Sequence, residues 1–173
     1  SDSKMYIDDS GNLSVADIRS RCRRQQTRYG LDLVIVDYLG LLQLGNKRGS
    51  LVADIAEATR ALKILAKELQ VPIMLLCQLS RGSESRKENG YRPILADLRD
   101  SGAIEQDADM VLLLYRKALA MRNRKDDSEY GGAPAEEIED NTAEVIVAKN
   151  RNGPLKTVNL AFQGMFSRFV NPS

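Results

Sequence analysis

Histidine and tryptophan are absent from the 173 residues, and cysteine occurs only twice. Without histidine the chain cannot form a Ser-His-Asp or Cys-His catalytic arrangement, and it lacks the commonest side chain for binding transition metals. Cys22 and Cys77 are far apart in the sequence and imply neither a disulfide framework nor a zinc site, so we interpret both as buried structural thiols. Any catalysis therefore depends on carboxylates, lysine, arginine, amides or a bound metal.

Long apolar runs and a large net charge are also lacking. No apolar run approaches the roughly 18 residues that a membrane span needs, and the formal net charge is only +1. A charge this small predicts no strong overall attraction to nucleic acid, so any such binding must come from local clusters of charge. The first ten residues contain no signal-peptide core, and the expected location is the cytoplasm, without a membrane.

The apolar pattern predicts strands that alternate with helices. Residues 31–37, 71–78 and 110–116 are almost unbroken apolar runs, typical of parallel strands that are covered on both faces. Helical spacing of apolar residues predicts one helix from Ser14 to Gly30 and a second over residues 51–69. This order predicts an α/β fold with right-handed crossovers in a parallel sheet.

The other segments are expected to extend this sheet or to interrupt it. Residues 143–162 predict an antiparallel hairpin around a turn at residues 150–154, and residues 165–170 predict a further short strand. Residues 94–109 are expected to form short helical turns. Residues 119–141 are charged and contain glycine and proline, so we expect a flexible surface insertion there.

Polar side chains follow the first two predicted strands, at the sheet edge where ligands of parallel sheets collect. Asp37 ends the first apolar run, in the position of a Walker B carboxylate that holds Mg²⁺ through water. Gln78 ends the second run, and its amide could orient water or sense a terminal phosphate. Either residue alone is more often a turn cap or a satisfied strand end, so the prediction depends on the two together.

Two other clusters of charge are candidates for binding an anion. In the first cluster, residues 98–109, Gly102 lets a backbone approach a ligand closely among Arg99 and several acidic residues. The alternative for this run, more frequent when it is taken alone, is a solvated acidic turn. Lys149 and Arg151 alternate along the predicted hairpin, and two neighbouring cations repel each other unless an anion lies between them. The alternative for this pair is two exposed basic residues that protect a sheet edge.

Four segments, in this order, resemble the ATPase domain of bacterial hexameric replicative helicases of the DnaB type: LDLVIVDYLGLLQ, VPIMLLCQLSR, RPILADLRDSGAIEQDADMVLLLYR and IVAKNRNGP. The resemblance extends from Tyr6 to Val170. It implies a RecA-like, mostly parallel sheet with flanking helices and a C-terminal antiparallel hairpin. It also implies ATP hydrolysis with Mg²⁺ between subunits of a homohexameric ring, which translocates 5′ to 3′ on single-stranded DNA and unwinds the duplex at the replication fork. Primase and a helicase loader are the partners that the resemblance implies.

The resemblance assigns roles to seven residues. Asp37 corresponds to the Walker B magnesium carboxylate, and Gln78 to the residue that couples the terminal phosphate to DNA. Lys149 and Arg151 correspond to a pair that reaches the nucleotide of the neighbouring subunit, with Arg151 as the arginine finger. An arginine finger needs a positive charge, N–H donors in a forked arrangement and a rigid turn that holds it. An arginine in this hairpin agrees with these needs. The loop that touches the DNA backbone corresponds to Arg99, Asp100 and Gly102.

The chain departs from the family pattern in several places. No G-x-x-x-x-G-K-[ST] loop for cradling phosphates occurs in the 173 residues, and the catalytic glutamate expected with that loop is missing too. Tyr38 is not a second acid, and Gly40 stands where the family usually carries glutamine. We therefore expect the C-terminal part of a RecA-like ATPase domain without its Walker A portion, inactive or nearly so by itself.

Two alternatives stay open from the sequence. A RecA-type recombinase or another RecA-fold ATPase would share the Walker B strand, but it would not be expected to share ADLRDSGAIEQDAD. A non-catalytic module that kept the fold without a phosphate loop would act through protein or DNA contacts.

Overall fold

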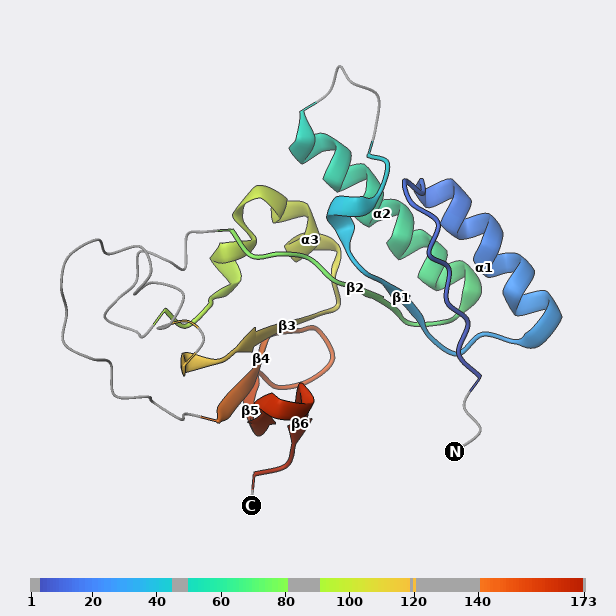
Figure 1. Cartoon of the computed structure of the whole chain (residues 1–173). Helices are drawn as coiled ribbons and strands as arrows, with labels where there is room; N and C mark the ends of the chain where they lie inside the picture. Colours follow the sequence, from blue (N-terminus) through green and yellow to red (C-terminus); the bar gives the residue numbers. More distant parts are fainter. Residues whose placement is uncertain (1–3, 45–49, 81–90, 119, 121–140, 173) are drawn as a thin grey trace. The chain divides into compact units, whose positions relative to one another are not determined.

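The computed structural model describes residues 4–44, 50–80, 91–118, 120 and 141–172, and it leaves out the side chains of Arg99, Asp100 and Ser101 (Figure 1). The contacts divide the chain into two compact units. One unit comprises Ser1–Gln78 with Ser101–Asp107, and the other comprises Leu79–Asp100 with Ala108–Ser173. The predicted insertion at residues 119–141 lies almost entirely outside the described residues.

Helix α1, Val15–Tyr29, begins and ends where its capping residues predict. The Ser14 hydroxyl accepts a hydrogen bond from the Asp17 backbone N–H (3.2 Å), and the Asp17 carboxylate accepts one from the Ser14 N–H (3.0 Å). This reciprocal capping box satisfies two N–H groups that the first turn leaves without helical partners. The helix ends at Gly30, whose φ of 80° is in the range that favours glycine.

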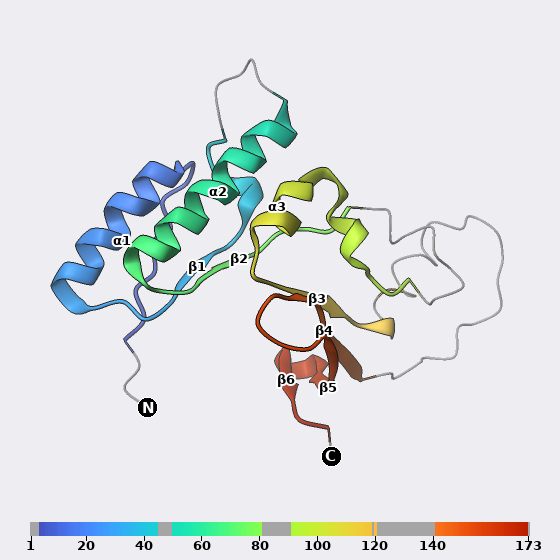
Figure 2. The ribbon, with the colours of Figure 1, turned by 180° about the vertical axis from the view of Figure 1, so that it is seen from behind.

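Helix α2, Leu51–Leu69, has the predicted bounds and provides most of the core of the first unit. The short strands β1, Val34–Val36, and β2, Ile73–Leu75, pair in parallel, with Val34 opposite Ile73 and Val36 opposite Leu75. Helices α1 and α2 lie side by side along this strand pair in both views (Figure 1, Figure 2). The buried residues that join these elements are Ile18, Val36, Leu65, Leu69 and Val71.

The other face of the strand pair is more exposed than its apolar sequence predicts. Ile35 is 58% exposed, and Met74, which lies opposite it, is 48% exposed. The continuous apolar run predicts cover on both faces, but α1 and α2 cover only the face of Val36 and Leu75.

A second core cluster joins α2 to two shorter elements of the first unit. Leu39, in the 3₁₀ turn η1 (Leu39–Leu41), packs with Ile55 of α2 and Ile104 of α3 (Gly102–Asp107). The helical turns expected over residues 94–109 are confirmed as η4 (Leu95–Ser101) and α3.

The second unit contains an antiparallel sheet with the strand order β3-β4-β5-β6. These strands are Met110–Tyr115, Thr142–Asn150, Lys156–Gln163 and Arg168–Val170. The predicted hairpin is β4 and β5, and the predicted final strand is β6. Strand β3, which was predicted as a strand of the sheet, pairs antiparallel with β4. Its apolar run identifies a strand but not the neighbour, because pairing depends on contacts between distant segments.

Aromatic contacts hold the end of β3 to β5 and β6. The guanidinium of Arg116 lies over the ring of Phe162, 3.5 Å from its centroid. Phe162 packs in turn against Phe169, with 4.9 Å between the ring centroids. Among the described helices, none is both long enough and apolar enough to cross a membrane.

Candidate functional site

Asp37 and Gln78 both follow the parallel strands at the same edge of the sheet. Backbone pairing continues past the strand ends, because the Leu76 N–H donates to the Val36 carbonyl (3.0 Å) and the Leu39 N–H donates to the Leu76 carbonyl (2.9 Å). In this register Asp37 lies opposite Leu76, and Gln78 comes two residues later. Both side chains are exposed. The strand register therefore brings the carboxylate and the amide to one edge, where a ligand can approach them.

Asp37 is followed by a tight turn that is shaped by Tyr38 and Gly40. The Asp37–Tyr38 peptide is cis, and η1 begins at Leu39. A Cβ atom built on Gly40 would lie 2.5 Å from Cε2 of the Tyr38 ring, a distance at which one of the two must move. Any residue larger than glycine at position 40, glutamine included, therefore requires a different position of the ring.

The donor set at this edge fits part of a magnesium nucleotide site. Asp37 offers an exposed carboxylate, and carboxylate oxygens are the ligands that Mg²⁺ prefers. Within the described residues, no group of three or more His, Cys, Asp or Glu side chains could hold a metal ion. A single carboxylate is sufficient for an ion that is held mainly by water and by substrate phosphates. The phosphate-binding loop itself is not among the 173 residues.

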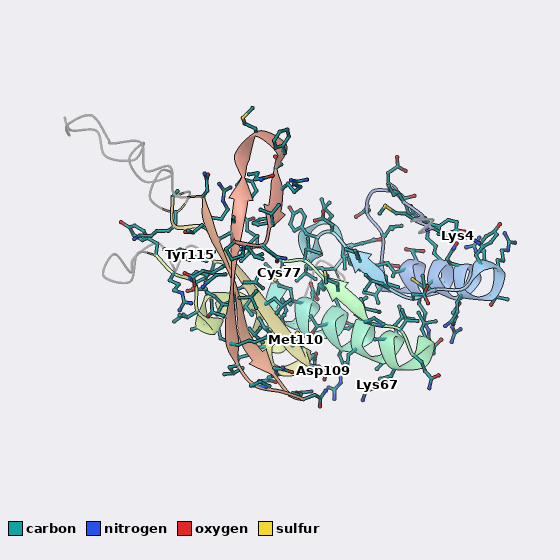
Figure 3. All side chains as sticks on the ribbon, turned by 90° about the horizontal axis from the view of Figure 1, so that it is seen from below. Lys4, Lys67, Cys77, Asp109, Met110 and Tyr115 are labelled. Carbon is teal, nitrogen blue, oxygen red and sulfur yellow. The ribbon has the colours of Figure 1, made fainter. Side chains whose placement is uncertain are left out.

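Arg151 lies in the turn directly after β4, where its backbone and its side chain both contact Asp109. The Arg151 N–H donates to the Asp109 carbonyl (2.9 Å), and its Nη1 lies 3.4 Å from the Asp109 Oδ1. Asp109 precedes β3, and Figure 3 labels it beside Met110, with Tyr115 at the other end of the strand. Lys149, within β4, is opposite Val111 and is partly buried.

The side chain of Asn150 holds the turn that contains Arg151. Its Oδ1 accepts a hydrogen bond from the Asn152 N–H (3.2 Å), and its Nδ2 donates to the Pro154 carbonyl (3.5 Å). A Cβ on Gly153 would lie 2.8 Å from this Nδ2, so a larger residue there would displace the amide. Two hydrogen bonds of Asn150 thus tie together the turn that carries Arg151, and the finger role of Arg151 stays a prediction.

The predicted DNA loop is only partly described. Arg99 and Asp100 belong to η4, and their side chains are outside the described part of the chain. Gly102 begins α3 and is exposed, and a Cβ built on it would meet no atom within 4 Å. No neighbouring atom of the described chain therefore requires glycine at this position, and the predicted close approach of a ligand stays a prediction.

Buried polar contacts support the elements around this loop. Asp97 is only 2% exposed, and its carboxylate accepts a hydrogen bond from the Ile94 N–H (2.8 Å) at the start of η4. In the other unit, the buried Thr59 hydroxyl donates to the Asp107 carboxylate (2.9 Å) and so ties the end of α3 to α2. Sequence reasoning missed both contacts. Thr59 and Asp107 are 48 positions apart, so no local pattern indicates that they pair.

Cys22 and Cys77 are partly buried, and two arginines of α1 form ion pairs with α2. Cys22 and Cys77 are free thiols, and partial burial raises the pKa of each, which disfavours the reactive thiolate. Glu68 of α2 forms ion pairs with Arg23 and Arg19 of α1. The hydrogen bond from Arg23 is the main reason that the Glu68 pKa is lowered. Arg19 and Arg23 thus join α1 to α2.

Two solved structures share this fold, one described as an ATPase domain and the other as a DnaB-like replicative helicase. The ATPase domain of G40P matches with a TM-score of 0.75 and 38% identity, over 94% of this chain and 52% of that one. A DnaB-like replicative helicase, described with its interactions with primase, matches with a TM-score of 0.77 and 38% identity, over 96% of this chain and 38% of that one. The predicted fold class, a partial α/β ATPase domain with a parallel sheet and a C-terminal antiparallel hairpin, is confirmed.

The model of the DnaB-like helicase C terminal domain family matches residues 1–171, and the chain belongs to this family. The replicative DNA helicase DnaB of Leifsonia xyli is 49% identical over 98% of the chain and 34% of its own length. The replicative DNA helicase DnaC of Bacillus subtilis is 43% identical over 99% of the chain and 35% of its own length. The chain thus spans about a third of these relatives. The predicted family is confirmed, whereas the roles of individual residues remain predictions.

Proposed function

We propose that a full-length protein containing this chain is a replicative DNA helicase that hydrolyses ATP between the subunits of a homohexameric ring. The ring would translocate on single-stranded DNA, 5′ to 3′, and unwind the duplex at the replication fork. The observation that carries the proposal is the family match over residues 1–171. The convergence of Asp37 and Gln78 at one sheet edge supports the nucleotide-binding part.

Asp37 and Gln78 are the residues of this chain that would face the nucleotide of their own subunit. Asp37 would hold Mg²⁺ through water, and the ion when bound would neutralise charge on the phosphates. Gln78 can donate and accept hydrogen bonds without changing its charge, so it can position water and respond to the terminal phosphate. Asp37 directly follows a paired strand, and Gln78 comes two residues after Leu76, whose backbone still pairs with the first strand.

Lys149 and Arg151 would act on the nucleotide of the neighbouring subunit. A guanidinium can bind two phosphate oxygens at once, and a cation near the transferred phosphoryl group stabilises the charge of the transition state. The Asn150 turn supports Arg151 on a short, hydrogen-bonded segment. Hydrolysis would then require assembled subunits.

Arg99, Asp100 and Gly102 would form the contact with the DNA backbone. A protein that translocates along DNA must bind every base sequence equally, so contacts to the phosphates without base preference are expected. Arg99→Ala should weaken single-stranded DNA binding about equally for all sequences and make it less dependent on salt. An unchanged salt dependence would refute the phosphate contact of Arg99.

Primase and a helicase loader are the proposed partners, and the cytoplasm is the proposed location. A solved DnaB-like relative was described together with its interactions with primase, which supports the first partner. The relatives are replicative helicases, and this supports a location where the chromosome is replicated.

Arg151→Ala in the full-length protein tests the proposal directly. It should abolish ATP hydrolysis and largely spare nucleotide binding, since the finger acts mainly in the transition state. Arg24→Ala, an exposed arginine of α1, is the matched control and should leave both unchanged. Equal losses of binding and hydrolysis in Arg151→Ala would contradict the finger role.

The absence of a phosphate loop from the 173 residues favours one alternative, a non-catalytic binding module. Calorimetry with Mg-ATP and the 173-residue chain separates the two functions. Under the helicase proposal this chain alone should show no detectable binding, whereas the full-length protein should bind. Binding by the chain that is lost in Asp37→Asn would mean that unassigned residues hold the phosphates. Absence of binding by the full-length protein would favour the non-catalytic module.

A further inference from the structure

We propose that Asp109 is a positioning residue, which holds the guanidinium of Arg151 at the end of the β3–β4 pair in the orientation needed for hydrolysis. The inference rests on the proposed finger role of Arg151. It concerns a residue for which the sequence suggested no partner.

The sheet register makes Asp109 the cross-strand neighbour of Arg151. Met110 lies opposite Asn150, so one further step of the antiparallel pairing places Asp109 opposite Arg151. The Arg151 N–H to Asp109 carbonyl hydrogen bond, 2.9 Å, shows that the pairing continues to this step. Opposite charges at such a position attract each other across the strands.

Asp109 thus contacts both the backbone and the side chain of Arg151. Its carbonyl accepts the backbone N–H, and its carboxylate Oδ1 lies 3.4 Å from the Arg151 Nη1. The other side of the turn is held by Asn150, through Asn152 and Pro154. With the backbone held in this way, the remaining freedom of Arg151 is in its long side chain. The carboxylate reduces that freedom, which lowers the entropic cost of placing the guanidinium on a phosphate.

The pair is exposed, so the guanidinium stays accessible to a phosphate while Asp109 holds it. The side chains of Arg151 and Asp109 are 48% and 55% exposed. Ion pairs with this exposure contribute little to folding stability because solvent screens them. A guanidinium binds phosphate through shorter, charge-assisted and often bidentate hydrogen bonds. Arg151 has five N–H donors, so it can keep its contact with Asp109 through Nη1 while its other N–H groups bind a phosphate.

The first test observes the side chain of Arg151 in the 173-residue chain by NMR. The Nε–H signal of Arg151, assigned with Arg151→Lys, should shift in Asp109→Ala and return toward its original position in Asp109→Glu. The matched control is Asp8→Asn, which removes an ion pair of similar exposure between Asp8 and Arg21. It should leave the Arg151 signal in place. A signal that Asp109→Ala does not move would overturn the proposal.

The second test measures ATP hydrolysis by the full-length protein. Asp109→Ala should lower kcat roughly ten- to a hundredfold, the scale expected when a catalytic group is displaced by about 1 Å. The KM for ATP should change by less than about twofold, and Asp109→Glu should recover most of the rate. Asp109→Asn keeps the size of the side chain and should lower kcat in the same direction. The thermal midpoint of each variant should stay close to that of Asp8→Asn.

The outcomes separate this inference from the function on which it rests. If Arg151→Ala abolishes hydrolysis but Asp109→Ala keeps kcat within about twofold, the positioning role is wrong and the finger role stands. If Asp109→Ala and Asp109→Glu lower kcat equally, the charge of residue 109 does not position Arg151, and the inference is again overturned. If Arg151→Ala hydrolyses ATP at the original rate, both the finger role and the inference fail.

Discussion

Replacing Thr59 with valine should weaken the attachment of the end of α3 to α2, which the packing of Ile104 against Ile55 leaves in place. Valine has nearly the shape of threonine but lacks the hydroxyl that donates to the Asp107 carboxylate at 2.9 Å. A hydrogen bond to a charged group contributes about 1.5 to 3 kcal/mol to stability. Asp107 is partly exposed, so water replaces some of the lost interaction, and we expect the lower part of that range, about 1.5 to 2 kcal/mol. At about 2 to 4 °C per kcal/mol for a domain of this size, the thermal midpoint should fall by roughly 3 to 8 °C.

Thr59→Ser is the matched control because it keeps the hydroxyl and removes only a methyl group, at a cost of about 0.8 kcal/mol. Urea unfolding followed by circular dichroism at 222 nm reports on the first unit, which contains α1 and α2. A double-mutant cycle with Asp107→Ala isolates the contact and should give a coupling energy of at least about 0.5 kcal/mol. Additive effects, or a valine variant at least as stable as the serine variant, would refute this reasoning.

Three further perturbations test other parts of the structure. Leu65→Ala should lower the free energy of unfolding by about 2 to 5 kcal/mol, because Leu65 is 1% exposed in the first core cluster, and a loss below about 1 kcal/mol in urea unfolding would contradict this packing. Asp8 should titrate by NMR at a pKa of about 2, lowered mainly by its hydrogen bond from Arg21, and Arg21→Gln should move this pKa toward 3.8. The contribution of Asp8 to stability should therefore be present above pH 3.8 and be lost as the pH falls through about 2. If Arg21→Gln leaves the Asp8 pKa unchanged, the ion pair between Asp8 and Arg21 is not its cause. Gly40→Gln should force the exposed Tyr38 ring to move, which NMR should detect as a shift of the Tyr38 ring signals, whereas unchanged signals would contradict the close approach of position 40 to the ring.

The helices could be predicted from the sequence because their signals are local. Ser14 and Asp17 are three positions apart and form the cap of α1 with each other, and Gly30 ends the helix without help from distant residues. The stripe of apolar residues that defines α2 repeats within single turns, so the bounds Leu51–Leu69 follow from the sequence alone. The ADLRDSGAIEQDAD and AKNRNGP segments likewise indicated the family, because such strings identify a family without any knowledge of which residues they contact in space.

Strand partners and side-chain contacts required the tertiary structure. The apolar run of β3 could belong to either kind of sheet, and only its register with β4, across an intervening segment of 26 residues (116–141), shows that it is antiparallel. Asp109 and Arg151 are 42 positions apart, and Thr59 and Asp107 are 48 positions apart. Sequence by itself thus determined the helices, the positions of the strands and the family of this protein. Which strands pair, and which carboxylates meet Thr59 and Arg151, was decided by the tertiary structure, because such contacts depend on how the whole chain packs rather than on short-range periodicity.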